Sequence, residues 1–211
     1  MRLGVIACEA FKEELEFLMA EDPDIIYKEY LEFHLHEHPK ELRSTVIDKV
    51  NALEGDVDSV FLAYGICQSL EGVINELRVP TATLKEDDCI GVLLTTDGYE
   101  EERKNCTGTF YATPYFAQYK GLRWFKEELC RRMPNYEELG IDFDWYMDRL
   151  FDGYSRCLLI DTGVGDQALC EHSSKEFADY LNLEHQSRTG TLERLEDGLL
   201  RAKSIAYSSP I

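Results

Sequence analysis

The sequence predicts an α/β protein with a mainly parallel, Rossmann-like sheet and helices on both faces. Short apolar runs, typical of buried strands, alternate along the chain with segments whose apolar residues recur at helical spacing. Turn and cap residues separate them: Pro39 suits the first turn of a helix, Pro80 ends another, and Asp87 or Asp88 suits a helix N-cap. With 211 residues, 44% of them hydrophobic, the chain can bury a substantial core.

The first half of the chain contains four predicted strands, each followed by a helix. The strands are expected at 2–8, 25–36, 59–67 and 81–85, and the helices at 9–22, 39–56, 69–78 and 87–95. Repeated strand–helix–strand units imply parallel strands joined by right-handed crossovers.

The pattern changes near Asn105 and then resumes. Strands are expected at 107–119, 155–163, 184–190 and 204–209, with helices at 121–133, 136–151, 166–182 and 191–202. We therefore divide the chain into an N-terminal lobe, 1–105, and a C-terminal lobe, 106–211. The pattern is compatible with one doubly wound sheet or with two facing lobes.

The charge of the chain restricts its partners. The formal net charge is −19, and the 22 basic residues form no stripe. Nucleic acids and anionic membranes would repel such a surface, so neither is an expected partner. Only seven residues precede Cys8, too few for a signal peptide, and no apolar run is long enough to span a bilayer. We expect a cytoplasmic protein with reduced thiols.

Four consecutive predicted strand ends each supply a possible metal ligand. Cys8, His36 and Cys67 end the first three strands, and Cys89 follows the fourth within a few residues. Because parallel sheets bind ligands at the carboxyl ends of their strands, these side chains could share one centre. Three thiolates and an imidazole suit zinc, or less well an iron–sulfur centre. The alternative is that each cysteine packs in the core, as we expect for Cys106, Cys130, Cys157 and Cys170.

Other residues could act at the same or a second site. Cys67 could be a nucleophile at a helix N-terminus, and Asp161, at a strand end, could act as acid or base unless it is only a helix cap. Tyr64 could add a hydroxyl to the site. Tyr111 and Tyr115 belong to an aromatic segment that could line a cofactor pocket or form core.

The motifs "ACEAF", "LHEHPKEL", "YGIC", "DDCIGVLL", "GTFYATPYF" and "LLIDTG" occur in this order along the chain. In this the sequence resembles the domain-of-unknown-function family 1638, whose members occur in anaerobic archaea and bacteria, often beside genes of corrinoid-dependent methyltransferases. The resemblance implies a role in methyl-transfer metabolism. It also implies that Cys8, His36, Cys67, Cys89 and Asp161 correspond to the cysteines, the histidine and the acidic residue of the family's motifs. The sequence departs from the family pattern at Gln68, where a Gly is usual, and at 85–87, where Arg and His are usual.

Three functions are compatible with these observations. The first is a zinc protein of corrinoid or one-carbon metabolism, possessing a zinc-thiolate methyltransferase-like activity if it is an enzyme. The second is a non-catalytic accessory protein that binds a corrinoid, a corrinoid protein or another small molecule. The third is a metal-free thiol enzyme in which His36 would serve Cys67 as base. The sequence leaves the substrate and the oligomeric state open.

Overall fold

The computed structural model describes residues 1–66 and 69–208, and it divides into two compact units. Unit 1 comprises Met1–Tyr99 together with the segment that begins at Thr191, and unit 2 comprises Glu100–Gly190. The C-terminal segment therefore groups with the first unit, whereas the sequence analysis assigned it to a lobe of 106–211.

Unit 1 contains a parallel sheet with the strand order β2-β1-β3-β4. Its strands are β1 (Leu3–Cys8), β2 (Ile25–Leu31), β3 (Ser59–Ala63) and β4 (Thr81–Thr83). Every residue of β1 and β3 is buried. These are the continuous apolar runs of the sequence, as expected for strands covered on both faces.

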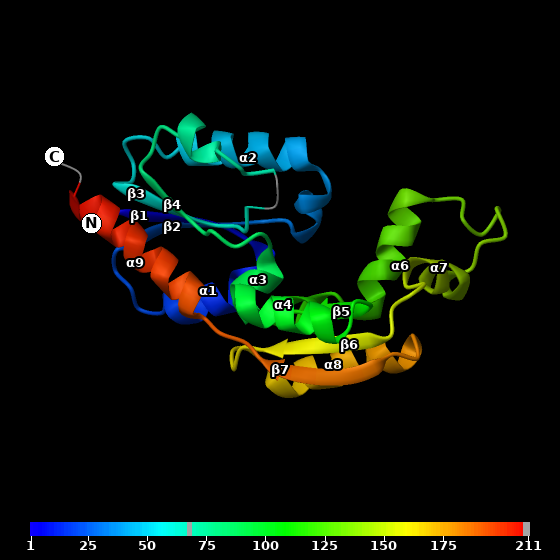
Figure 1. Ribbon diagram of the computed structural model, residues 1–211. Helices are drawn as coiled ribbons and strands as arrows, with labels where there is room; N and C mark the ends of the chain where they lie inside the picture. The colour runs from blue at the N-terminus through cyan, green and yellow to red at the C-terminus, as the bar shows by residue number, and fades with distance from the viewer. Residues whose placement is uncertain (67–68, 209–211) are drawn as a thin grey trace. The chain divides into compact units, whose positions relative to one another are not determined.

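Helices cover both faces of this sheet. They are η1 (Glu9–Phe11), α1 (Lys12–Leu18), η2 (Phe33–Glu37), α2 (Pro39–Asn51), η3 (Val73–Glu76), α3 (Cys89–Leu94) and α9 (Glu193–Ser208); α4 (Thr96–Asn105) continues into unit 2. Figure 1 shows α2 on one face and α1 with α9 on the other. Helix α9 packs closely on β3, because a Cβ at Gly198 would lie 2.3 Å from the Phe61 ring.

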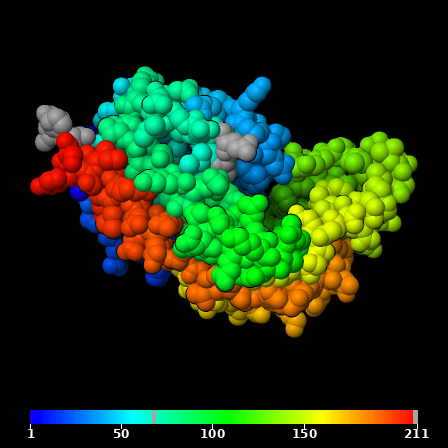
Figure 2. Space-filling view, viewed as in Figure 1, coloured from blue at the N-terminus to red at the C-terminus, as the bar shows by residue number. Residues whose placement is uncertain are grey.

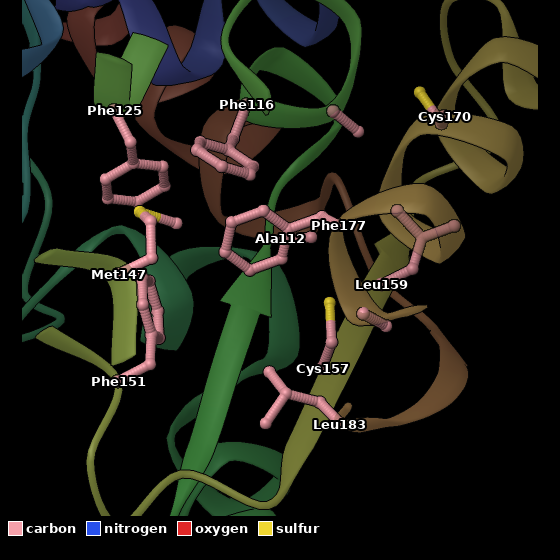
Figure 3. Close-up of a cluster of buried hydrophobic side chains, with 12 residues drawn as sticks. Ala112, Phe116, Phe125, Met147, Phe151, Cys157, Leu159, Cys170, Phe177 and Leu183 are labelled. Atoms are coloured by element: carbon pink, nitrogen blue, oxygen red, sulfur yellow. The ribbon is translucent and has the colours of Figure 1, made fainter. Parts of the chain in front are cut away.

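Unit 2 contains a second parallel sheet, β5-β6-β7. Its elements are β5 (Thr109–Ala112), α5 (Pro114–Tyr119), α6 (Gly121–Arg132), α7 (Phe143–Leu150), β6 (Arg156–Asp161), α8 (Gln167–Tyr180) and β7 (Glu184–Thr189). An aromatic cluster that includes Phe116, Phe125, Phe151 and Phe177 forms its core (Figure 3).

The predicted α/β class with parallel sheets is confirmed, but several boundaries differ. Strand β2 ends at Leu31, so His34 and His36 lie in η2 rather than on the strand. Segment 69–78 contains only the 3₁₀ helix η3, and the segment from Pro114 forms α5 instead of continuing a strand. The predicted last strand is wrong: α9 continues to Ser208, because Ala202 and Ala206 extend its buried stripe at helical spacing.

Candidate functional site

The carboxyl ends of the unit 1 strands form the candidate site. We call the segments that follow the four strands the rim: 8–11, 32–38, 64–66 and 84–89. Strand β1 lies between β2 and β3; the chain leaves β1 through α1 and leaves β2 through α2, and these two helices lie on opposite faces of the sheet. A crevice is expected at such a reversal of strand order, which is where open parallel sheets bind ligands.

Cys8 and Tyr64 border this reversal. Ala7 pairs with Ala63 in the parallel register, so Cys8 and Tyr64 are the next residues on neighbouring strands. Cys8 is 7% exposed and Tyr64 is also buried. The Glu9 carboxylate accepts a hydrogen bond from the backbone N–H of Phe33 (3.0 Å), which joins the segment after β1 to the segment after β2.

His36 does not occupy the strand end predicted for it. His36 lies in η2, five residues beyond the end of β2, with its ring edge-on to Phe33 at a centroid distance of 5.4 Å. His34 Nε2 lies 3.2 Å from the Glu32 carboxylate, and His38 directly precedes Pro39 at the start of α2. In a 3₁₀ helix each residue turns by about 120°, so alternate histidines do not share a face as they would on a strand.

The segments after β3 and β4 contact each other through their backbones. The N–H of Ile66 donates to the carbonyl oxygen of Glu86 (2.8 Å). A Cβ at Gly65 would lie 2.7 Å from the Cα of Asp88, so this approach requires glycine. Residues directly before Cys67 therefore contact residues directly before Cys89; Cys67 itself lies outside the described residues.

Cys89 is the first residue of α3. Asp88 caps this helix by accepting a hydrogen bond from the N–H of Gly91 (2.9 Å), which confirms the predicted cap. Within the described part of the chain, no group of three or more His, Cys, Asp or Glu side chains is placed to hold a metal ion. Cys8, His36 and Cys89 thus share the rim without forming a three-ligand set among themselves.

The rim contains a cavity of about 190 Å³ at the ends of β3 and β4. Its wall is mostly apolar, and Glu71 and Lys85 are its charged residues. The lining residues are Leu62, Tyr64, Gly65, Ile66, Leu70, Glu71, Gly72, Val73, Ile74, Thr83, Leu84 and Lys85.

Asp161 lies at the end of β6 in unit 2, as the sequence predicts. Its Oδ1 accepts a hydrogen bond from the N–H of Gly163 (2.9 Å), which forms a turn before α8. Asp161 also lines a separate cavity of about 310 Å³ with Gln167 and Glu171. The helix cap of α8 is Asp166, whose carboxylate accepts from the N–H of Leu169 (2.9 Å).

The two tyrosines predicted to line a cofactor pocket belong to unit 2. Tyr111 is on β5, where burial raises the pKa of its phenol. Tyr115 is buried in α5, 5.2 Å from the Tyr119 ring, and the Lys120 ammonium lies 5.4 Å from its ring centroid. Their aromatic neighbours Phe110 and Phe116 pack in the unit 2 core.

Sequence reasoning missed two features. Cys106 is partly exposed, and hydrogen bonds from the Ser155 and Thr109 hydroxyls lower the pKa of its thiol; nothing in the local sequence indicates this. The second is a groove lined by Lys85, Arg194 and Arg201. Its sequence signal is two arginines at the i, i+7 spacing of one helix face in an otherwise acidic chain.

None of the helices within 1–66 and 69–208 combines the length and apolar character needed to cross a membrane.

Comparison with known proteins gives a family and no characterised relative. No curated protein matches the chain. The sequence model of one family, described as "Protein of unknown function (DUF1638)", matches residues 30–199, most of the chain. The chain therefore belongs to this family.

Proposed function

We propose that the rim of unit 1 binds zinc through Cys8, Cys67 and Cys89, with His36 or a water molecule as the fourth ligand. The observation that supports this is the contact between the segments after β3 and β4, at Ile66–Glu86 and Gly65–Asp88. It places the residues that precede two of the cysteines side by side, next to the strand end that carries Cys8. Three thiolates are a donor set that zinc accepts.

Bound zinc would lower the pKa of a thiol or water and present it as a nucleophile at neutral pH. The residues of the chain would position it: Gly65 allows the two segments to approach, and Asp88 fixes the start of α3, where Cys89 lies. The resemblance noted from the sequence adds a metabolic setting, methyl transfer with a corrinoid protein as partner. Activation of a methyl-accepting thiol is compatible with that setting.

Metal analysis of anaerobically purified protein tests the zinc proposal. We expect about one zinc per chain, lost in Cys8→Ser and in Cys89→Ser. Cys130→Ser, which changes an exposed cysteine on α6, is the matched control and should retain the metal. Circular dichroism establishes that each variant is folded. Protein without zinc or iron, or zinc retained in both rim variants, would contradict the proposal.

The rim cavity favours a second candidate, a non-catalytic accessory protein that binds a small organic molecule. At about 190 Å³ the cavity is smaller than the typical 300–1,000 Å³ of drug-sized ligands, so it suits a compact molecule and not a whole corrin ring. Its apolar wall would supply most of the contact area, and Lys85 and Glu71 would orient a polar group.

Ligand-observed NMR with a library of small organic molecules tests the second candidate. Compounds that bind should lose binding in Ile74→Arg, which changes an exposed residue of the cavity wall. They should keep it in Ile26→Arg, an equally exposed site on β2. Binding should also persist without turnover in Cys67→Ser. If Ile74→Arg leaves every interaction intact, the cavity is not the binding site.

A further inference from the structure

A groove of about 480 Å³ runs between α9 and the segment that follows β4, within unit 1. Figure 2 shows the exposed surface of α9 in orange and red. The lining residues are Lys85, Glu86, Arg194, Asp197, Leu200, Arg201 and Ser204. Those from α9 recur at helical spacing on its solvent-facing side, opposite the stripe that packs on β3 and β4.

The groove concentrates positive charge in an acidic protein. Three of its seven lining residues are basic, in a chain whose net charge is −19. The groove also contains two acidic residues, Glu86 and Asp197, and Glu86 is largely buried in its wall. Its side chain is 10% exposed, one carboxylate oxygen lies 3.0 Å from Arg194 Nε, and the other accepts from the N–H of Lys85 (3.0 Å). The negative charge of Glu86 is therefore paired with Arg194 within the wall of the groove.

The basic side chains of the groove have N–H groups that make no hydrogen bond within the described part of the protein. Arg201 Nε donates to the carbonyl oxygen of Asp197 (3.3 Å), which holds this side chain along the helix. Within residues 1–66 and 69–208, the Nη atoms of Arg194 and Arg201 and the Lys85 ammonium donate no hydrogen bond to the protein, and Arg201 and Lys85 form no ion pair. A guanidinium fork matches the geometry of a carboxylate or phosphate, and two forks with an ammonium can surround one such group.

The groove also has an apolar part. Leu200 is 59% exposed on α9 and lines the groove next to Arg201. Asp197 lines the same helix face, within one turn of both Arg194 and Arg201, and its carboxylate disfavours a second negative charge in the groove. A ligand that uses all these contacts has one anionic head and one uncharged, carbon-rich end.

We propose that this groove binds a small organic anion, whose carboxylate or phosphate contacts Arg194, Arg201 and Lys85 while its apolar end covers Leu200. The site contains none of the proposed zinc ligands, and it is a neighbour of the rim cavity, because Lys85 lines both. The strong net negative charge of the chain excludes a nucleic acid as the source of the anion.

Isothermal titration calorimetry with four probes tests the proposal: benzoate, phenyl phosphate, inorganic phosphate and neutral benzamide. We expect benzoate or phenyl phosphate to bind and benzamide not to bind. The tighter of the two anions identifies the head group as a carboxylate or a phosphate ester. Added salt should weaken the interaction.

Variants locate the site. Arg194→Gln and Arg201→Gln should each weaken binding at least about tenfold, whereas Arg123→Gln, at an exposed arginine on α6, should leave it unchanged. Leu200→Ser should weaken phenyl phosphate but not inorganic phosphate. Lys85→Gln provides a further variant outside α9, should an α9 variant fail to fold. Equal binding of benzamide, or wild-type affinity in the folded arginine and lysine variants, would overturn the proposal.

Discussion

Two cysteines illustrate how position determines the chemistry of a thiol. Cys157 is fully buried on β6, and burial raises the pKa of its thiol to about 12. Cys106 is partly exposed, and its Sγ lies 3.3 Å from the Ser155 hydroxyl, whose hydrogen bond lowers the thiol pKa. Because the thiolate is the reactive form, the two residues should differ strongly in reactivity.

Alkylation with iodoacetamide, mapped by mass spectrometry, measures this difference. Cys106 should react in the native protein, with a pH midpoint below the value of about 8.5 for an ordinary thiol, because its lowered pKa leaves more thiolate at neutral pH. Cys157 should react only after unfolding. Ser155→Ala should move the Cys106 midpoint to higher pH, and an unchanged midpoint would show that the hydroxyl does not stabilise the thiolate.

At the scale of elements, the packing of α9 on β3 depends on a glycine. A Cβ at Gly198 would lie 2.3 Å from ring atoms of Phe61, which is fully buried. The helix can approach the sheet this closely only because position 198 has no side chain. This contact joins a helix near the end of the chain to a strand more than a hundred residues earlier.

Gly198→Ala should therefore destabilise the protein. We expect a loss of about 1–3 kcal/mol, because the helix must move away from the strand or the ring must leave its rotamer. Thermal unfolding followed by circular dichroism measures the effect, with Glu196→Ala on the exposed side of α9 as the control. Phe61→Leu in the same chain should make Gly198→Ala less costly. Additive losses would mean that the two residues do not compete for space.

A second feature at this scale is the buried ion pair that joins α4 to β6. Glu102 and Arg156 are each 8% exposed and their charged groups lie 2.7 Å apart; Arg188 on β7 also pairs with Glu102. Burial alone would raise the pKa of Glu102, but hydrogen bonds from Arg188 and Arg156 outweigh it and lower the pKa. The stabilisation is thus present above the unfolded-state pKa and is lost as the pH falls through the folded-state value.

Glu102→Gln should cost about 3 kcal/mol at pH 7, because it leaves Arg156 buried without a compensating charge. Glu100→Gln, which removes an exposed pair with Lys104 on the same helix, should cost less than about 0.5 kcal/mol. Urea unfolding can be followed by tryptophan fluorescence, since Trp124 and Trp145 both lie in unit 2. The difference between the variants should shrink toward acidic pH; equal losses at pH 7 would contradict the assigned role.

At the scale of the whole molecule, the order of the chain does not follow the order of the units. Unit 1 contains the first 99 residues and the segment from Thr191, and unit 2 is inserted between them. The apolar face of β3 and β4 is covered by α9, which follows unit 2 in the chain. The core of unit 1 is therefore built from two segments that unit 2 separates along the chain.

Removal of α9 tests its part in this core. A chain that ends at Gly190 should expose the β3–β4 face, bind 8-anilinonaphthalene-1-sulfonate strongly and lose part of its helical circular dichroism signal. A chain that ends at Ser208 keeps the whole helix and should match the full-length protein in both measurements. Unchanged dye fluorescence in the shorter chain would mean that α9 is not needed to cover the sheet.

The difference between sequence and structure is clearest at the rim. The placement of Cys8 at a strand end and Asp88 as a cap follows from local patterns, because apolar runs and cap residues act over a few neighbours. His36 was placed wrongly, because the pattern of 25–36 predicts one strand, whereas β2 ends at Leu31 and a 3₁₀ helix forms at Phe33–Glu37. The groove that contains Arg194 could not be predicted, because its other wall comes from the Lys85 segment, about a hundred residues away.

The sequence by itself determined the α/β class, the positions of the buried strands β1, β3 and β6 and the acidic character of the protein. These properties depend on composition and short-range periodicity. Tertiary structure alone decided that the strands form two sheets, that α9 returns to unit 1 and that Gly65 brings two rim segments together. Such pairings depend on shape and contact between residues distant in the chain, about which local periodicity carries no information.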